Sequence, residues 1–220
     1  MQFLSEDIRA METRRRAAFI NSLTGFKPAN LVGSVDSRGH TNLAIMSSAV
    51  HLGAAPPLVA LVIRPGGEER HTLANILATG HYSLNHVHSS IVEAAHQTAA
   101  RYGRDESEFE ATGLTPEWLK GFPAPLVAEA NVRLGLQLRE HQRLQLNDTH
   151  LVIGEIVLAD LPDGCLRNDG ALDLEATGTV ALAGLDTYHQ PLKLKRMAYA
   201  KPDLPPRSIW QRIPALRLEA

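Results

Sequence analysis

The sequence predicts a mainly β protein, an antiparallel β-barrel with peripheral helices. Segments with the composition of β-strands outnumber segments with helical spacing, and several strands are joined by turns of hairpin length. No G-x-G-x-x-G pattern follows a strand and no G-x-x-x-x-G-K-[ST] pattern is present. A doubly wound nucleotide-binding sheet and a P-loop are therefore not expected.

Composition narrows the class of protein and of partner. A chain of 220 residues with 44% apolar and 21% charged residues is ordinary for a soluble globular protein. The net charge of −2 and the aromatic content of 5% give no support for nucleic-acid binding or for an acidic membrane surface. The single cysteine, Cys165, excludes an internal disulfide and suits a reducing compartment.

No targeting or membrane segment is expected. The first 19 residues are charged throughout and contain no apolar stretch of signal-peptide length. No window approaches the roughly 18 apolar residues that a membrane-spanning helix needs. We therefore expect a cytoplasmic protein.

The first 28 residues are predicted to form a helical lead-in. Ser5 is placed to cap a helix that has acidic residues in its first turn, and Ile8, Met11 and Phe19 give it an apolar face. Gly25 ends this region.

Residues 30–52 are predicted to be a hairpin around which the chain is organised. Residues 30–35 are β-branched and apolar, residues 36–39 have turn chemistry, and residues 40–48 form the returning strand. That strand ends in small and hydroxylated residues where a core strand would carry bulk. The pattern fits a floor on which a ligand lies close to the backbone, and it fits equally a tight sheet contact with surface serines.

Alternating strands and helices are expected next. They are a strand buried on both faces at 58–63, a loop at 64–70, a helix starting at His71 with Thr72 as its cap, a strand at 82–87 and a helix at 91–102.

The second half of the chain has less regular spacing. Residues 103–125 form an irregular acidic excursion that packs over the barrel through Phe109, Leu114, Trp118 and Phe122. Two long strands follow at 131–140 and 151–159, with Asn147 and Asp148 near their turn. The chain is thus expected to divide into the lead-in 1–28, a barrel domain 29–200 and a proline-rich tail 201–220.

The segment 64–72 is the best candidate for an anion site. It combines the end of a strand, a Gly-Gly loop, Arg64, Arg70, His71 and a helix start at Thr72. Free N–H groups at a helix start favour phosphate, and arginine adds two-pronged donors. The alternative is a solvated loop in which both arginines pair with Glu68 and Glu69.

Other candidate sites are less distinct. Ten histidines suggest a metal hypothesis, but no H-E-x-x-H pattern or Cys/His set is present, so no metal site is predicted. Ser47 and Ser48 do not lie in a G-x-S-x-G elbow. Tyr188 and His189 lie in a loop that is either a surface turn or a lid that stacks on a planar ligand.

Four motifs in order resemble the flavin reductase-like family, whose fold is an FMN-binding split β-barrel with Greek-key-like antiparallel strands. They are SVDSRGHTNLAIMSS, PPLVALVIRP, RHTLANILATGHYSLNHV and HLVIGEIV, and the similarity extends over residues 30–199. The resemblance implies that FMN, or FAD, is the cofactor and that NADH or NADPH is the electron donor. It also implies a homodimer with flavin near the subunit interface.

The resemblance also implies a set of cofactor-binding residues. Flavin would lie along residues 42–48, its phosphate near the loop and helix start, and its ring near Asn85 and His86, with Tyr188 or the tail contributed by the partner chain. Met46 stands where many relatives carry an aromatic residue or proline. The full set is Asn42, Leu43, Ala44, Ile45, Met46, Ser47, Ser48, Arg64, Arg70, His71, Thr72, Asn85, His86 and Tyr188.

The implied reaction is hydride transfer from the nicotinamide to flavin N5, with the reduced flavin supplied to a monooxygenase partner. No essential acid or base is expected, and His86 and His189 are candidates for the open face of the ring. One alternative is a protein that holds FMN tightly as an electron carrier or sensor without free-flavin reductase activity. Another is a histidine-based metal or haem binder.

Overall fold

The computed structural model describes residues 1–66 and 71–209. The chain divides into two compact units, Met1–Gln190 and Pro191–Ala220, and the predicted division into lead-in, barrel domain and tail stays a prediction. In the described part of the second unit, Met197 and Ser208 form an isolated antiparallel bridge.

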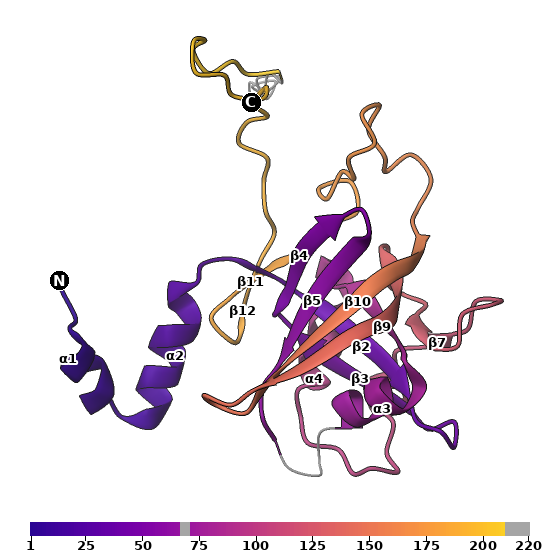
Figure 1. Ribbon diagram of the computed structural model, residues 1–220. Coiled ribbons are helices and arrows are strands. Elements are labelled where there is room, and N and C mark those ends of the chain that lie inside the picture. The colour runs from indigo at the N-terminus through magenta and orange to yellow at the C-terminus, as the bar shows by residue number, and fades with distance from the viewer. Residues whose placement is uncertain (67–70, 210–220) are drawn as a thin grey trace, which may run out of the picture. The chain divides into compact units, whose positions relative to one another are not determined.

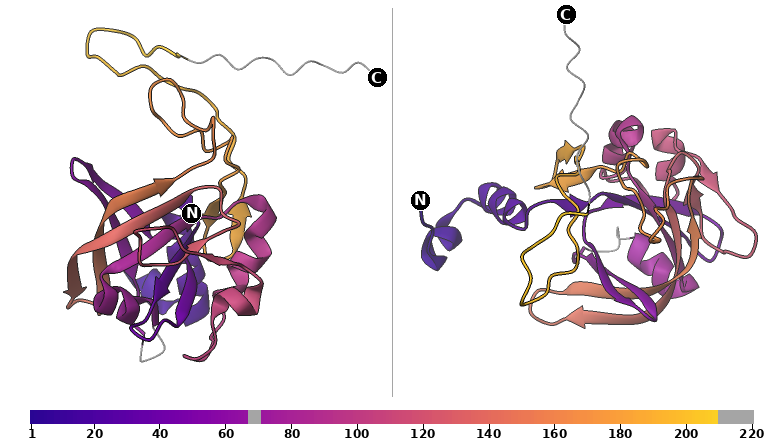
Figure 2. Two further views of the ribbon diagram at one scale, coloured as in Figure 1. Left: turned by 90° about the vertical axis from the view of Figure 1, so that its right-hand side faces the viewer. Right: turned by 90° about the horizontal axis from the view of Figure 1, so that it is seen from above.

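A seven-stranded antiparallel sheet forms the body of the first unit, in the order β3-β2-β6-β9-β10-β5-β4 (Figure 1). It curls into a barrel that is seen end-on in Figure 2. The mainly β prediction is confirmed. The strands are β2 (Asn30–Val35), β3 (Thr41–Met46), β4 (Ala49–Ala54), β5 (Pro57–Ile63), β6 (His81–His86), β9 (Arg133–Leu144) and β10 (Thr149–Asp160).

The predicted hairpin is β2 paired with β3, in the register Val32 opposite Ala44. The strands β3 and β4 are consecutive in sequence but form the two outer strands of the sheet, and only Ser47 and Ser48 separate them. Strand β4 was not predicted. Its burial is slight and its pairing with β5 shifts between His51 and Gly53, so the period-two pattern is interrupted.

Two apolar clusters lie on the two faces of the sheet, because side chains alternate along each strand. On β2, Val32 belongs to the cluster inside the barrel, with Leu61, Tyr82 and Val152. The neighbouring Leu31 faces the other way. It belongs to a second cluster whose fully buried members also include Leu43, Val87, Phe109 and Val127.

Two glycines are required where another group approaches a strand closely. A Cβ atom on Gly33 would lie 2.4 Å from the carbonyl oxygen of Pro125 and 2.5 Å from Ser83 Oγ. A Cβ atom on Gly154 would lie 2.3 Å from the hydroxyl oxygen of Tyr82. The sequence therefore leaves the backbone bare at both points so that the segment around Pro125 and the Tyr82 ring can pack against it.

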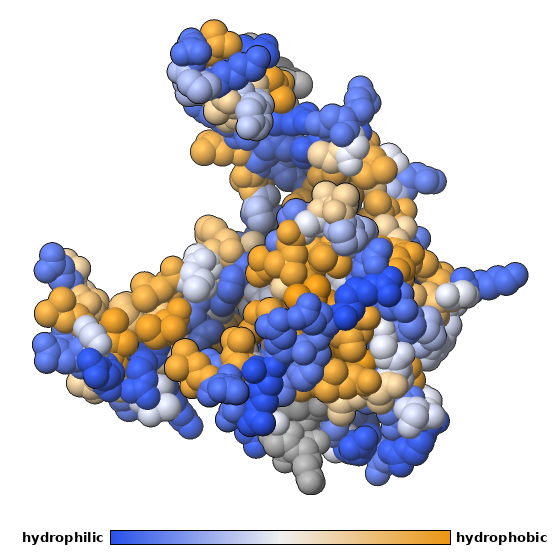
Figure 3. Space-filling model, in the orientation of Figure 1, coloured by the Kyte–Doolittle hydropathy of each residue, from blue (hydrophilic) through white to orange (hydrophobic). Residues whose placement is uncertain are grey.

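The N-terminal region contains two helices instead of one, α1 (Ser5–Ala10) and α2 (Thr13–Leu23). The prediction that Ser5 caps the first helix is wrong, since the helix begins at Ser5 and Leu4 precedes it as the cap. Glu12 separates the helices and caps α2 by accepting hydrogen bonds from Arg14 N and Arg15 N. Apolar side chains cover much of the surface of α1 and α2 in Figure 3.

Three further helices pack on the barrel: α3 (His71–Thr79), α4 (Val92–Gln97), which follows the 3-10 turn η1 (Ser89–Ile91), and α5 (Glu108–Thr112). The helix predicted at 91–102 is therefore shorter than expected. Thr72 does not cap α3 but lies in its first turn. The end of α3 at Gly80, whose φ is +73°, is as predicted.

The remaining strands are short and join distant parts of the chain. A three-stranded sheet consists of β1 (Lys27–Pro28), β11 (Ala181–Ala183) and β12 (Thr187–His189), and a two-stranded sheet consists of β7 (Pro116–Glu117) and β8 (Leu126–Val127).

The excursion at 103–125 packs on the barrel as predicted, through three of the four expected anchors. Phe109 is fully buried, and Leu114 and Phe122 are also buried. The prediction for Trp118 is wrong, because half of its surface is exposed.

Candidate functional site

An open cleft of about 1080 Å³ lies along the outer strand β3. Its walls come from the link between β3 and β4, the end of β5, the start of α3, the segment from α4 to α5, and β11 with the loop to β12. Ten of the predicted site residues line it, namely Asn42, Ala44, Ile45, Met46, Ser47, Ser48, Arg64, His71, Thr72 and Tyr188. The structure therefore gathers in one cleft residues that are spread over most of the first unit.

Two of the remaining predicted residues take part in the core instead. Leu43 is fully buried in the cluster with Phe109. Asn85 is also fully buried, and its amide donates to Leu31 O at 3.0 Å while its side-chain oxygen accepts from Val127 N at 3.0 Å. These contacts tie β2, β6 and β8 together. Arg70 lies outside the described residues.

His86 does not line the cleft, and its surroundings give it a structural role. Its Nδ1 lies 3.3 Å from Thr179 Oγ1, and burial lowers the pKa of its imidazole to about 4. His189, the second predicted open-face histidine, packs edge-on against Phe26 with ring centroids 4.8 Å apart. A role of either residue at a flavin ring stays a prediction.

The lowered pKa of His86 predicts that the protein loses stability in mild acid. An unfolded histidine has a pKa near 6.5, so between about pH 6.5 and 4 the unfolded chain takes up a proton that the folded chain does not. Over that interval the free energy of unfolding should fall by about 2–3 kcal/mol more in the wild type than in His86→Gln. Urea unfolding at several pH values measures this difference, and parallel pH curves for the two proteins would contradict it.

The floor of the cleft carries hydrogen-bond donors that the described part of the chain does not use. At the link between β3 and β4, Ser48 Oγ donates to Val62 O at 2.6 Å, and Val62 N donates to Ser48 O at 3.2 Å. These bonds fix the link against β5. Among residues 1–66 and 71–209, no acceptor pairs with the backbone N–H groups of Ser47 and Ser48 or with the Ser47 hydroxyl.

Positive charge gathers on one side of the cleft. Lys27 Nζ donates to Gly184 O at 2.8 Å and to Asn21 O at 3.1 Å, and its pKa is lowered by burial and by the charge of Arg64. Arg64 is exposed and forms no ion pair with any described residue. Its alternative pairing with Glu68 and Glu69 lies outside the described residues.

The start of α3 is fastened to the floor. Asn42 Nδ2 donates to Thr72 Oγ1 at 2.9 Å, and both residues are buried. Glu108 also lines the cleft. Burial raises the pKa of its carboxyl group, against the opposing effect of the Leu43 N–H that it accepts.

An aromatic pair closes another side. Tyr188 lines the cleft and its hydroxyl lies 3.0 Å from Nδ1 of His96, with the two rings at nearly a right angle. Burial raises the pKa of the Tyr188 hydroxyl, so the tyrosine stays neutral. Tyr188 thus lies half-buried on the cleft wall, on strand β12, and its stacking on a planar ligand stays a prediction.

Sequence reasoning missed several residues of the cleft, including Lys27, His96, Thr98 and Glu108. They come from short elements and turns with no period-two or helical pattern. One signal was available: Glu108 is an acidic residue directly beside the apolar anchor Phe109, which places a carboxylate where the chain enters the core.

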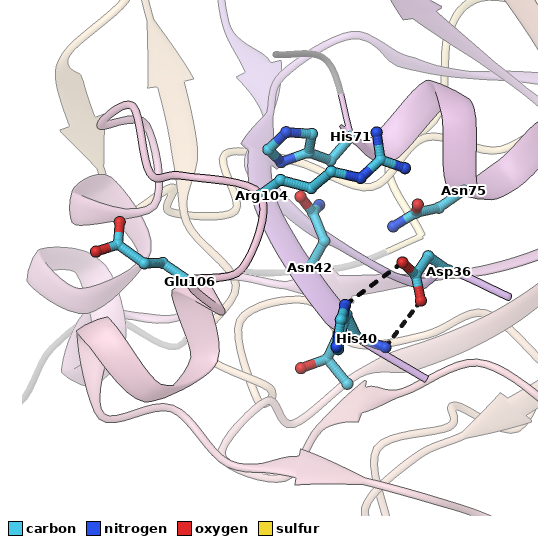
Figure 4. Close-up of a pocket in the computed structure, with 8 residues that line it drawn as sticks. Asp36, His40, Asn42, His71, Asn75, Arg104 and Glu106 are labelled. Carbon is cyan, nitrogen blue, oxygen red and sulfur yellow. Dashed lines mark hydrogen bonds and ion pairs between the residues drawn. The ribbon is translucent and has the colours of Figure 1, made fainter. Parts of the chain in front are cut away.

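A small polar pocket of about 10 Å³ adjoins the cleft, and Asn42 and His71 line both (Figure 4). Arg104 extends into it from the excursion, while Asp36 enters from the β2–β3 turn. Burial alone would raise the pKa of Asp36, but the N–H groups of His40 and Arg38 outweigh it and hold the value at about 2. The pocket has room for one water molecule, so it is too small to hold part of a ligand and does not extend the cleft.

Residues 1–66 and 71–209 contain neither a cluster of metal-ligating side chains nor a helix that could span a membrane. No three histidine, cysteine or carboxylate side chains gather there as they would around a metal ion. None of the helices in those ranges has the length and apolar character needed to cross a membrane.

Comparison with known proteins gives a consistent match. The family model for the flavin reductase like domain matches residues 26–175. An uncharacterized protein of Aquifex aeolicus is 28% identical over 164 residues, which cover 74% of this chain and 83% of that protein.

Solved structures match over nearly the whole chain. A candidate flavin reductase with a split barrel domain from Shewanella frigidimarina is 56% identical and superposes with a TM-score of 0.88, covering 91% of this chain and 100% of that one. Nitrilotriacetate monooxygenase component B from Bacillus cereus superposes with a TM-score of 0.78 at 24% identity, covering 88% and 98%. The second match shows the fold alone. The family resemblance inferred from the sequence motifs is confirmed.

Proposed function

Because this chain belongs to the flavin reductase-like family, we propose that it binds FMN in the cleft along β3 and catalyses its reduction by NADH or NADPH. The observation that carries the proposal is the combination of three features in one cleft. Within residues 1–66 and 71–209, no acceptor pairs with the backbone N–H groups of Ser47 and Ser48 on the floor, Arg64 forms no ion pair, and apolar and aromatic side chains form the walls.

The chemistry of these groups fits FMN, which has a planar ring with hydrogen-bond acceptors at one edge and a phosphate at the end of a chain. Ser47 and Ser48 would donate to the ring, while Met46 and Tyr188 pack on its apolar area. Arg64, with His71 and Thr72 at the start of α3, would hold the phosphate. The cleft volume is at the upper end of the usual range for ligand sites, so a nicotinamide can enter beside the flavin.

When bound, FMN supplies the ring nitrogen N5 that accepts hydride from the nicotinamide. The protein's part is to bind, orient and shield the reactants. The floor at residues 42–48 would contact one face of the flavin ring and hold the ring in place. The Tyr188–His96 pair would narrow the opening through which water enters the cleft. No acid or base from the chain is required for this transfer, because the flavin ring itself accepts the hydride.

The experiment is an anaerobic absorbance spectrum of the purified protein with FMN, taken before and after NADH and then NADPH. We expect the flavin band to bleach with one of the nucleotides and to do so repeatedly when free flavin is in excess. A bound flavin that neither nucleotide reduces would reject the reductase and favour the electron carrier or sensor. No flavin binding would reject the assignment of the cleft.

We also propose that the chain forms a homodimer and passes reduced flavin to a monooxygenase. The dimer is supported by exposed apolar side chains next to the cleft, where Phe26 is 70% exposed and Ile20 is 43% exposed. The partner is suggested by the likeness to a monooxygenase component. Light scattering should give twice the chain mass of 24.0 kDa.

A further inference from the structure

The proposed flavin floor is an outer strand, which leaves its alternate N–H groups without a neighbouring strand. On β3 these are the N–H groups of Leu43 and Ile45, since β2 pairs with the other side of the strand. A strand edge with unpaired N–H groups can bend, pair with another chain or bind water. Here the two groups are satisfied by side chains from elsewhere.

Glu108 and Thr98 supply the missing acceptors. Glu108 Oε2 accepts from Leu43 N at 2.8 Å, and Thr98 Oγ1 accepts from Ile45 N at 2.9 Å. Thr98 in turn donates to Ala95 O at 2.8 Å, so its hydroxyl orientation is fixed. Both side chains are more than nine-tenths buried, and both line the cleft.

The acceptors stand on anchored supports. Phe109, directly after Glu108, is fully buried in the cluster that also contains Leu43, and Ala95 is fully buried in the same cluster. A third side-chain contact, between Thr41 Oγ1 and Ser107 Oγ at 2.7 Å, continues the row along β3. The segment from α4 to α5 therefore contacts β3 at three successive alternate residues, twice at its backbone N–H groups and once at a side chain.

We propose that Glu108 and Thr98 are positioning residues that hold β3 in the conformation that binds FMN. The inference rests on the proposed function for the identity of the ligand. Because Leu43 and Ile45 have already donated their N–H groups, the next outward donor along the chain is that of Ser47. Glu108 and Thr98 thus also set where on the floor a ligand can find a free backbone donor.

Amide hydrogen exchange of the flavin-free protein tests the positioning role directly. Glu108→Ala should accelerate exchange of the Leu43 amide by at least about tenfold beyond any change in global stability, while Thr98→Val should do the same for the Ile45 amide. Glu108→Gln should keep Leu43 protected because its amide oxygen still accepts, and Thr98→Ser should keep Ile45 protected. Unchanged exchange in both disruptive variants would overturn the proposal.

FMN titration tests the consequence for the ligand. Glu108→Ala and Thr98→Val should each weaken FMN binding by about tenfold or more, and their conservative partners by less than about threefold. Glu110→Ala is the matched control, because Glu110 lies exposed on the same helix and does not line the cleft. If Glu108→Ala does not fold, the Thr98→Val and Thr98→Ser pair decides the question at Ile45.

The outcomes separate the two proposals. Tight FMN binding by the wild type together with unaltered binding by both disruptive variants would overturn the positioning role and leave the proposed function intact. No FMN binding by the wild type would overturn the proposed function and with it the ligand assigned to the floor.

Discussion

Replacing Gly33 with alanine is expected to lower the free energy of unfolding by about 3–5 kcal/mol. The new Cβ atom would lie 2.4 Å from a backbone oxygen, that of Pro125, which cannot rotate away as a side chain could. It would also displace Ser83 Oγ, which donates a hydrogen bond to Pro125 O at 2.6 Å. Ser83 is fully buried, so its hydroxyl has no water to replace that acceptor. The free-energy cost of overpacking and the cost of leaving a buried polar group without its partner add together.

Chemical denaturation of the two proteins measures the difference. Gly103→Ala is a suitable control, because a Cβ atom there would meet only Glu106 Oε2 at an ordinary 3.5 Å and should change stability by less than about 0.5 kcal/mol. Equal losses in the two variants would show that the close approach at Gly33 is not the cause.

Replacing Arg64 with alanine is expected to weaken FMN binding by about 10- to 100-fold while leaving riboflavin binding nearly unchanged. The range follows from about 1.5–3 kcal/mol for a hydrogen bond to a charged group. Riboflavin has the same ring as FMN but no phosphate, so the comparison separates the phosphate contact from the floor. Arg64 suits this test because it forms no ion pair with the described residues, and its removal leaves none of their charges without a partner.

Fluorescence titration with both flavins gives the two affinities. Arg139→Ala serves as the matched control, since Arg139 lies on β9 outside the cleft and pairs with Glu155. An equal loss of FMN and riboflavin affinity in Arg64→Ala would place Arg64 at the ring, and no loss of either would remove it from the site.

The elements predicted correctly from the sequence are those whose pattern is local. The β2–β3 hairpin carries its own turn residues, and β9 with β10 alternates over a long stretch. Strand β4 escaped prediction because its residues are largely exposed, so no buried face imposes a pattern. The lead-in was predicted as a single helical region because spacing alone did not show that Glu12 ends one helix and caps the next.

The same distinction holds for the site. The small and hydroxylated end of the strand predicted at 40–48 fitted a ligand floor, and the family resemblance extended that floor to residues 42–48, where flavin binding stays a prediction. Glu108 and Thr98 were missed because their contacts with β3 span 65 and 53 residues, although the neighbouring anchor Phe109 was a signal that Glu108 lies near the core. His86 was predicted near the ring from the family resemblance; it does not line the cleft, burial lowers the pKa of its imidazole to about 4, and its role at the ring stays a prediction.

The pairing of Lys27 with Gly184 and of β1 with β11 has a consequence for biosynthesis. The cleft takes walls from residue 20 to residue 188, and one of its early contributors, Lys27 of β1, pairs with Leu182 of β11 in the three-stranded sheet. A growing chain on the ribosome can form the β2–β3 hairpin early, but Lys27 has no partner strand until residues 181–184 have emerged. No shorter N-terminal fragment carries the whole cleft, so the site is complete only when nearly all of the first unit has been made.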